Sequence, residues 1–177
     1  NSDWAVTADN AGTIDGTTAF SDIQSITGGS GNDTFTMGGS FLDSINGGDG
    51  TNAIERTDDT ASAWILNSPY TGTMDDMAFS DIQSITAYEN LAQGTNTLTG
   101  TNEGDTFVID GINSGSVTDK MDAYANIQSI TGGSDNDTFT IDNSYTITID
   151  GDDLVVSNLI GDVLLGDGAS DIFIGIN

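Results

Sequence analysis

The chain of 177 residues contains no cysteine and no histidine, one proline (Pro69) and only two basic residues, Arg56 and Lys120. Without cysteine, disulfide bonds are excluded and the redox compartment is left open. Without histidine or cysteine, the side chains that most often act as general bases and nucleophiles are missing. No apolar run approaches the ~20 residues that a membrane-spanning helix requires. We therefore expect a protein that neither catalyses a reaction nor inserts into a membrane.

What the chain has in excess is negative charge. Its 28 acidic residues, of which only Glu55, Glu89 and Glu103 are glutamate, give a formal net charge of −26. Such a surface repels nucleic acid and attracts divalent cations, so we expect no nucleic-acid partner. Acidic chains with few aromatic residues are sometimes disordered. Here the Ile, Phe, Leu and Val residues are regularly spaced, which indicates a folded chain.

The sequence contains direct repeats. The pentapeptide Ile-Gln-Ser-Ile-Thr occurs three times without change, starting at Ile23, Ile82 and Ile127. The first two copies share a wider context, because Phe-Ser-Asp precedes each of them and a tryptophan, Trp4 or Trp64, lies upstream. Direct repeats of this kind are typical of solenoids and arrays. We expect one domain over residues 1–177, with internal repeats at about 4–56, 64–110 and 121–177.

Short β-favouring runs separated by Gly, Asn, Asp and Ser predict an all-β fold. Within the runs, apolar and small polar residues alternate, as in Thr34-Phe35-Thr36. This alternation places successive side chains on opposite faces of a strand. Equivalent positions stack on one another in a parallel solenoid, so the identical pentapeptides favour a parallel β-solenoid, either a β-roll or a β-helix, over a β-sandwich. The number of sides in each rung stays open.

A second motif combines glycine with aspartate. Residues 28–36, with the sequence GGSGNDTFT, match the nonapeptide G-G-x-G-x-D-x-U-x, in which U is a large apolar residue. The chain therefore resembles the RTX (repeats-in-toxin) family of calcium-binding β-rolls. The motif returns at 132–140 and more loosely at 100–108, and residues 47–54 match it with Asn52 in place of the aspartate. The resemblance implies a turn that binds Ca²⁺ through carbonyl and carboxylate oxygens, followed by a strand.

Carried onto this sequence, the resemblance implies six aspartate ligands for Ca²⁺. Three belong to the motifs above and three recur at nine-residue intervals near the C-terminus; the six are Asp33, Asp105, Asp137, Asp153, Asp162 and Asp171. Adjacent rungs of a solenoid lie ~4.8 Å apart, and two stacked carboxylates at that distance repel by ~0.9 kcal/mol even in water. Bound Ca²⁺ relieves this repulsion, so we expect it at one or more turns. For any single motif, a turn without metal is the simpler alternative.

The predicted role is structural. Both ends of the predicted solenoid carry strands without a capping helix or loop, and uncapped strand edges pair with further strands. We expect a self-assembling filament, or a cell-surface or matrix protein, built by end-to-end stacking of copies; its acidity and RTX resemblance favour an extracellular location. The alternative is a stalk segment of a large RTX-type adhesin. An ice-binding protein with outward threonine pairs and a polysaccharide-active β-helix enzyme with paired carboxylates are the weaker alternatives.

Overall fold

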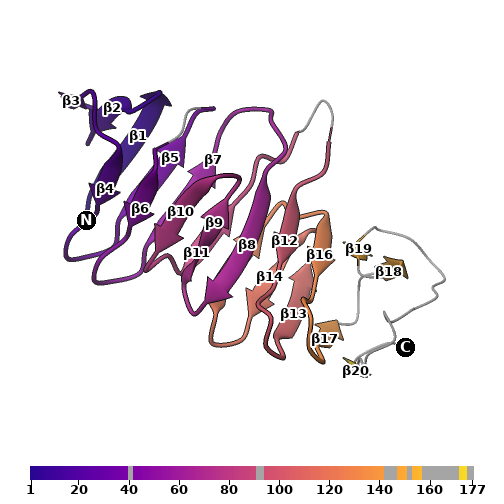
Figure 1. The fold of residues 1–177 in the computed structure, drawn as a ribbon. Coiled ribbons are helices and arrows are strands. Elements are labelled where there is room, and N and C mark those ends of the chain that lie inside the picture. Colours follow the sequence, from indigo (N-terminus) through magenta and orange to yellow (C-terminus); the bar gives the residue numbers. More distant parts are fainter. Residues whose placement is uncertain (40–41, 91–93, 142–146, 151–152, 157–171, 175–177) are drawn as a thin grey trace.

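The computed structural model describes residues 1–39, 42–90, 94–141, 147–150, 153–156 and 172–174, and from residue 141 onward it describes the backbone alone. Within these ranges the chain consists of strands, turns and irregular segments without a helix, which confirms the all-β prediction. No helix that could span a membrane is found among the described residues. The strands form two sheets that face each other (Figure 1).

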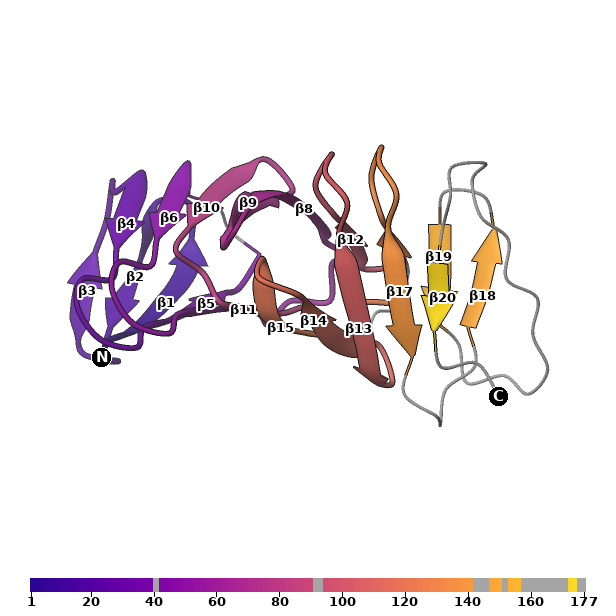
Figure 2. The same ribbon diagram turned by 90° about the horizontal axis from the view of Figure 1, so that it is seen from below.

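Within the described ranges, the first sheet, sheet A, has eleven strands, and the second, sheet B, has nine. From the N-terminal end, sheet A consists of β3 (Thr18–Phe20), β2 (Ala11–Ile14), β1 (Asp3–Ala8), β5 (Thr34–Met37), β7 (Ala53–Arg56), β11 (Ser84–Thr86), β15 (Met121–Ala125), β14 (Ser114–Val117), β13 (Thr106–Gly111), β17 (Thr138–Ile141) and β20 (Ile172–Ile174). In the same direction, sheet B consists of β4 (Ser25–Thr27), β6 (Ser44–Asn46), β10 (Met77–Ser80), β9 (Thr71–Met74), β8 (Ala63–Ser68), β12 (Thr97–Thr99), β16 (Ser129–Thr131), β19 (Asp153–Val156) and β18 (Ile147–Asp150). The two layers are seen one above the other in Figure 2.

Both sheets are mixed rather than purely parallel. Among the strands that the structure describes, ten pairings are parallel and eight are antiparallel. Six of the antiparallel pairings lie in three-stranded meanders, β1-β2-β3, β8-β9-β10 and β13-β14-β15, whereas the single strands between meanders pair in parallel. Each meander extends one sheet by three strands before the chain crosses to the other sheet.

The three meanders are structural copies of one another. Each has three non-glycine residues with a positive φ of 51° to 61°, one after each strand: Asn10, Asp15 and Asp22 in the first, Tyr70, Asp75 and Asp81 in the second, and Asn113, Asp119 and Asn126 in the third. Asn and Asp tolerate this left-handed region better than other non-glycine residues. The abundant Asp and Asn residues therefore serve in part to form tight corners.

The repeated pentapeptide carries the chain from each meander to the opposite sheet. Its last three residues form β4, β11 or β16, and the next strand, β5, β12 or β17, returns to pair in parallel with the first strand of the meander. The first unit contains two further strands, β6 and β7, which explains its greater length. The third meander starts at Thr106, ahead of the repeat boundary that the sequence suggests.

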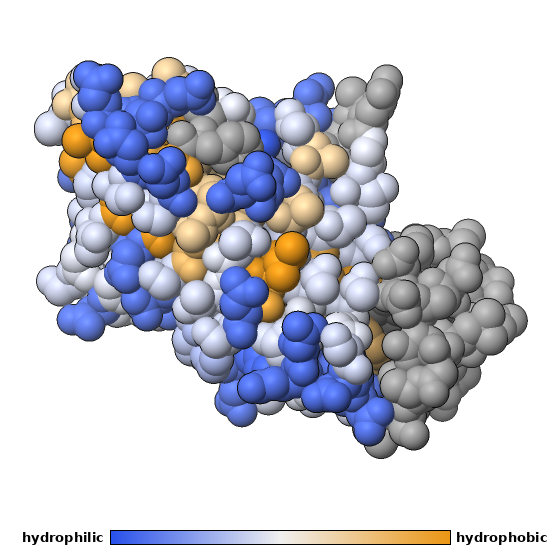
Figure 3. Space-filling view, in the orientation of Figure 1, coloured by the Kyte–Doolittle hydropathy of each residue, from blue (hydrophilic) through white to orange (hydrophobic). Residues whose placement is uncertain are grey.

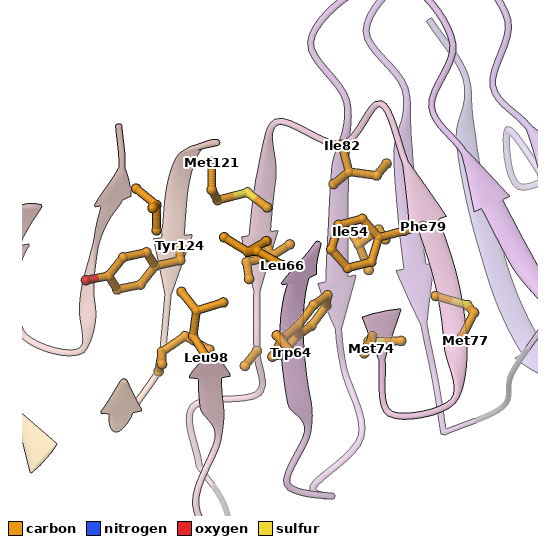
Figure 4. Packing of buried hydrophobic residues seen from close by; sticks show 14 of the residues in the cluster. Ile54, Trp64, Leu66, Met74, Met77, Phe79, Ile82, Leu98, Met121 and Tyr124 are labelled. Carbon is orange, nitrogen blue, oxygen red and sulfur yellow. The ribbon is translucent and has the colours of Figure 1, made fainter. Parts of the chain in front are cut away.

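Side chains that point between the sheets form the hydrophobic core (Figure 4). Aromatic rings on neighbouring strands stack, with ring centroids 5.0 Å apart for Phe107 and Phe139. In each meander, the aromatic ring of the third strand covers a glycine of the second; the pairs are Gly12 with Phe20, Gly72 with Phe79 and Gly115 with Tyr124. A Cβ at these glycines would overlap both the ring and a carbonyl of the first strand, so the sheets require glycine there.

Candidate functional site

The residue immediately before a strand, here called the pre-strand residue, is polar and buried at six places. These residues are Asp33, Asn52, Ser62, Asn96, Asp105 and Asp137, each at most 4% exposed. Three of them are predicted calcium ligands. Because a polar group removed from water must find partners within the protein, their hydrogen bonds show what the position does.

In the N-terminal half, pre-strand residues on neighbouring strands of sheet A are joined by side-chain-to-backbone hydrogen bonds. The Ser2 amide donates to Asp33 Oδ1 (2.6 Å), and the Asp33 amide donates to Asn52 Oδ1 (2.9 Å). The Asn52 amide in turn donates to Gln83 Oε1 (2.7 Å). We call this row the N-terminal stack. Each side-chain oxygen satisfies a backbone donor of the neighbouring strand at the point where regular pairing begins.

The same arrangement recurs at two other places. In sheet B, the Ser62 amide donates to Asn96 Oδ1 (2.9 Å) and the Asn96 amide donates to Gln128 Oε1 (2.8 Å). In sheet A, the Asp105 amide donates to Asp137 Oδ1 (2.8 Å), and we call this pair the C-terminal stack. Asp, Asn and Gln thus perform one structural task, since each supplies a side-chain carbonyl or carboxylate oxygen.

A glycine five residues earlier makes room for each of four pre-strand side chains. The pairs are Gly28 with Asp33, Gly47 with Asn52, Gly100 with Asp105 and Gly132 with Asp137. A Cβ at Gly28 would lie 2.5 Å from Asp33 Oδ2 and 2.6 Å from the Gly47 carbonyl oxygen. The glycine-to-aspartate spacing of the nonapeptide therefore has a steric cause in this chain that is independent of any metal.

Asp33 retains one carboxylate oxygen without a partner. Its Oδ2 atom is buried and makes no hydrogen bond in the described structure. Oδ2 and the Gly47 carbonyl oxygen both border the space beside Gly28. A buried carboxylate oxygen without a donor is costly, and convergent carboxylate and carbonyl oxygens are the donor types that Ca²⁺ prefers. This turn therefore fits a hard cation in the chemistry of its donors.

Asp105 differs because Lys120 lies against it. Lys120 Nζ is 2.8 Å from Asp105 Oδ1 and donates to Thr101 Oγ1 at 2.6 Å. The Thr101 amide donates to Asp105 Oδ2 (2.6 Å), so both carboxylate oxygens are engaged. Burial alone would lower the pKa of Lys120, but hydrogen bonding and charge from Asp105, with a contribution from Glu103, raise that pKa above its usual value. The ammonium group thus stays charged and balances the buried carboxylate.

The other basic residue, Arg56, is buried at the end of β7. Its guanidinium forms a bidentate pair with Asp58, at 2.8 and 2.9 Å, and reaches Asp75 Oδ2 at 3.2 Å. Burial acts to raise the pKa of Asp58, but hydrogen bonds from Arg56 and Thr60 and the Arg56 charge together hold that pKa below its usual value. Arg56 therefore links β7 of sheet A to the turn that follows β9 of sheet B.

The predicted calcium ligands are dispersed rather than gathered. Asp33, Asp105 and Asp137 occupy pre-strand positions in two separate stacks. Asp153 begins β19, but its side chain, like Asp162 and Asp171 as a whole, lies outside the described residues. Among the residues that the structure describes, no group of three or more acidic side chains is arranged to hold a metal ion.

The sequence reasoning did not assign a role to Asn96, Gln83 or Gln128, although these residues complete the stacks. A signal for the two glutamines was present. The glutamine of the repeated pentapeptide directly precedes a strand, which is the same position that the aspartate of the nonapeptide occupies. No comparable signal marks Asn96, because the segment between β11 and β12 is longer than its counterparts in the other two units.

The outer face of sheet B contrasts with the acidic composition. Strands β4, β6, β8, β9, β10, β12 and β16 contain no charged residue. In Figure 3 the hydrophilic residues gather mainly along the upper and lower margins of this face, where the turns lie. The threonine pairs considered for ice binding lie elsewhere, because Thr34 and Thr36 are on β5 and Thr138 and Thr140 are on β17, both in sheet A.

Comparison with protein-family models, curated proteins and solved structures finds no match to this chain. The likeness to RTX proteins therefore stays a resemblance between motifs.

Proposed function

We propose that this chain is a non-catalytic, extracellular β-solenoid that assembles head to tail into filaments or a surface matrix, with Ca²⁺ as a stabilising ion. The observation that carries the proposal is the state of the N-terminal end of the two sheets. In the described part of the chain, β3 and β4 are edge strands, each paired on one side. Edge strands of this kind pair readily with strands from another chain.

Strand direction supports stacking of copies. Following the pairings across sheet A, β20 at the far edge runs in the same direction as β3. Following them across sheet B, β18 runs in the same direction as β4. A copy placed head to tail would therefore pair in parallel in both sheets at once. Repeated heterologous contacts that do not close into a ring produce filaments.

Negative charge opposes this assembly. Copies with a formal charge of −26 each repel one another, and this repulsion weakens when salt screens it. Divalent cations lower the charge more effectively where carboxylate and carbonyl oxygens converge. The Asp33 turn offers such a place, because Oδ2 of Asp33 has no donor. We therefore expect assembly and stability both to rise with Ca²⁺.

Electron microscopy of the purified chain over a range of salt and Ca²⁺ concentrations tests the proposal. Filaments of constant width are expected at physiological or higher ionic strength. Dispersed particles under every condition would contradict it.

A stalk segment of a larger adhesin is the second candidate, because the same strands can pair when the neighbouring rungs belong to one longer chain. Under this second candidate, the chain stays monomeric and dispersed. Fusion of a second copy in tandem should then raise the temperature at which the chain unfolds.

A further inference from the structure

Four core positions of the first meander unit are more exposed than their equivalents in the other two units. Phe20 is partly buried, whereas Phe79 and Tyr124 are each 2% exposed. The same trend holds at two more positions. Trp4 is partly buried, whereas its equivalents Trp64 and Phe107 are at most 1% exposed. Ile14 is partly buried, whereas its equivalents Met74 and Val117 are at most 1% exposed. The fourth position lies in the repeated pentapeptide.

The pentapeptide provides an internal control, because its three copies are identical in sequence. Ile23 is 40% exposed, whereas Ile82 and Ile127 are both 0% exposed. The local backbone is also equivalent, since the amides of Ile23, Ile82 and Ile127 donate to the carbonyls of Asn10, Tyr70 and Asn113, the matching positive-φ residues. The difference in exposure therefore arises outside the pentapeptide, in what packs against it.

The structure shows what covers the other two units. In the second unit, β10 pairs in parallel with β6, and Phe79 is opposite Ile45. In the third unit, β15 pairs in parallel with β11, and Tyr124 is opposite Ile85. In both cases the covering strand comes from the preceding rung and places an isoleucine opposite the aromatic residue. The equivalent edge in the first unit is that of β3, with Phe20 at the matching position.

The pentapeptide strands follow the same rule. On the side facing the preceding rung, β11 pairs with β7, and Ile85 is opposite Ile54. On the same side β16 pairs with β12, and Ile130 is opposite Leu98. The corresponding side of β4, which contains Ile26, carries no strand in the described structure. Two adjacent edges, one in each sheet, therefore lack the rung that covers them elsewhere in the molecule.

We infer that this end face, made of β3, β4, Phe20 and Ile23, receives the terminal rung of a second copy of this chain. The incoming strand runs parallel to β3 and takes the register in which β6 pairs with β10 and β11 pairs with β15. The inference rests on the proposed head-to-tail assembly and names its contact. In sheet A the incoming strand is β20, whose register with β17 aligns Phe173 with the core residue Phe139. Phe173 of the copy thereby lies opposite Phe20, and Ile172 lies opposite Ala19.

A pair of matched substitutions tests the contact. Ile23 and Ile65 are 40% and 43% exposed, but Ile65 lies on the outer face of sheet B and away from the end face. Ile23→Asp and Ile65→Asp add the same charge at equally exposed positions. In sedimentation velocity with electron microscopy, we expect Ile23→Asp to raise the concentration needed for assembly at least about tenfold, because a charge is desolvated in the contact. Ile65→Asp should assemble like the unmodified chain.

A disulfide tests the register independently. The chain has no cysteine, so an Ala19→Cys/Ile172→Cys double variant should form an intermolecular ladder on oxidation, whereas each single variant should stop at dimers. If the unmodified protein assembles and both aspartate variants assemble equally well, the inferred contact is overturned while filament formation stands. The same holds if the unmodified protein assembles and the oxidised double variant forms no ladder. Loss of assembly in Ile65→Asp would also overturn it. Unmodified protein that stays monomeric under all conditions would overturn the proposed function together with the contact.

Discussion

The N-terminal and C-terminal stacks place a buried aspartate in the same structural position but surround its carboxylate differently. At Asp105 an internal cation, Lys120, binds the carboxylate at 2.8 Å, and both carboxylate oxygens have partners. At Asp33 one oxygen accepts the Ser2 amide and the other has no hydrogen-bond partner. The two stacks therefore share the hydrogen-bonding role of the pre-strand residue, whereas the surroundings of its second carboxylate oxygen differ.

The hydrogen bond that a pre-strand residue accepts does not depend on its charge. Asn52 and Asn96 occupy the same position as Asp33 and accept the same type of backbone hydrogen bond without carrying charge. Their amide groups donate to backbone carbonyls, those of Gly48 and Asp81 in the case of Asn52. An aspartate at this position carries a buried negative charge, whereas an asparagine donates to backbone carbonyls instead.

Removal of the internal cation should have the largest effect. Lys120→Met leaves Asp105, whose side chain is 0% exposed, as an unbalanced buried charge. Loss of one partner of a buried pair costs about 3–5 kcal/mol, and we expect a loss of stability of that order in urea unfolding. The double variant Lys120→Met/Asp105→Asn should recover a large part of it. Equal losses in the single and double variants would show that charge balance is not the cause.

Introduction of an unbalanced charge into the N-terminal stack should rank second. Asn52→Asp replaces two amide hydrogen bonds to carbonyls with oxygen–oxygen contacts and adds a carboxylate next to Asp33. We expect a loss of about 2–3 kcal/mol at neutral pH, measured by urea unfolding. Thr51→Asp, which adds the same charge at the exposed neighbouring residue, is the matched control and should change stability by less than about 0.5 kcal/mol.

The all-β class and the repeat could be predicted from the sequence, because period-two alternation and identical pentapeptides report directly on strands and equivalent positions. The meanders could not be predicted so readily. Their second strands, such as Ala11–Ile14, contain glycines and few large apolar residues, and their burial depends on an aromatic ring from the next strand. Antiparallel direction there follows from tight turns at residues such as Asn10 and Asp15, which the sequence presents simply as loop composition.

The candidate site was predictable in position but not in chemistry. The nonapeptide located Asp33, Asp105 and Asp137 at the starts of strands. That Lys120 would meet Asp105 depends on a turn of the third meander, 15 residues further along the chain, lying beside the 100–105 turn. Local patterns carry no information on such a contact, since it is set by the antiparallel pairing of β13 with β14.

Removal of charge at the two aspartates should affect stability unequally. Asp33→Asn takes away a carboxylate with an unpaired oxygen and restores the type of side chain seen at Asn52. In the presence of a chelator we expect its thermal midpoint to remain within about 2 °C of the unmodified chain, and Ca²⁺ to raise it no further. Asp105→Asn should lose about 1–3 kcal/mol, because Lys120 loses its ionic partner. A greater loss for Asp33→Asn than for Asp105→Asn would reverse the comparison.

Alkaline pH should destabilise the third meander, which contains Lys120 and Tyr124. The pKa of Lys120 is raised mainly by Asp105 against the effect of burial, and burial with the nearby Asp110 raises the pKa of Tyr124. A group with a raised folded-state pKa contributes full stability below its unfolded pKa, about 10 for both residues, and loses it as the pH rises further. Stability should therefore fall above about pH 10, and the difference in Tyr absorbance between the unmodified chain and Tyr124→Phe should report ionisation of Tyr124.

Tyr124→Phe should give the smallest effect. The Tyr124 hydroxyl is buried without a hydrogen-bond partner in the described structure, and phenylalanine occupies the equivalent positions 20 and 79. We expect a gain of about 0.5–1 kcal/mol in urea unfolding at pH 7 and a weaker loss of stability above pH 10. A destabilised variant would indicate that the hydroxyl has a partner of its own.

Amide hydrogen exchange with Ca²⁺ and with a chelator tests most directly the claim that the two stacks are balanced by different cations. We predict that Ca²⁺ slows exchange in the Asp33 turn, at residues 28–33 and 47–52, and leaves residues 100–105 unchanged because Lys120 already neutralises Asp105. Protection confined to residues 100–105, or no protection by Ca²⁺ at either turn, would contradict the account.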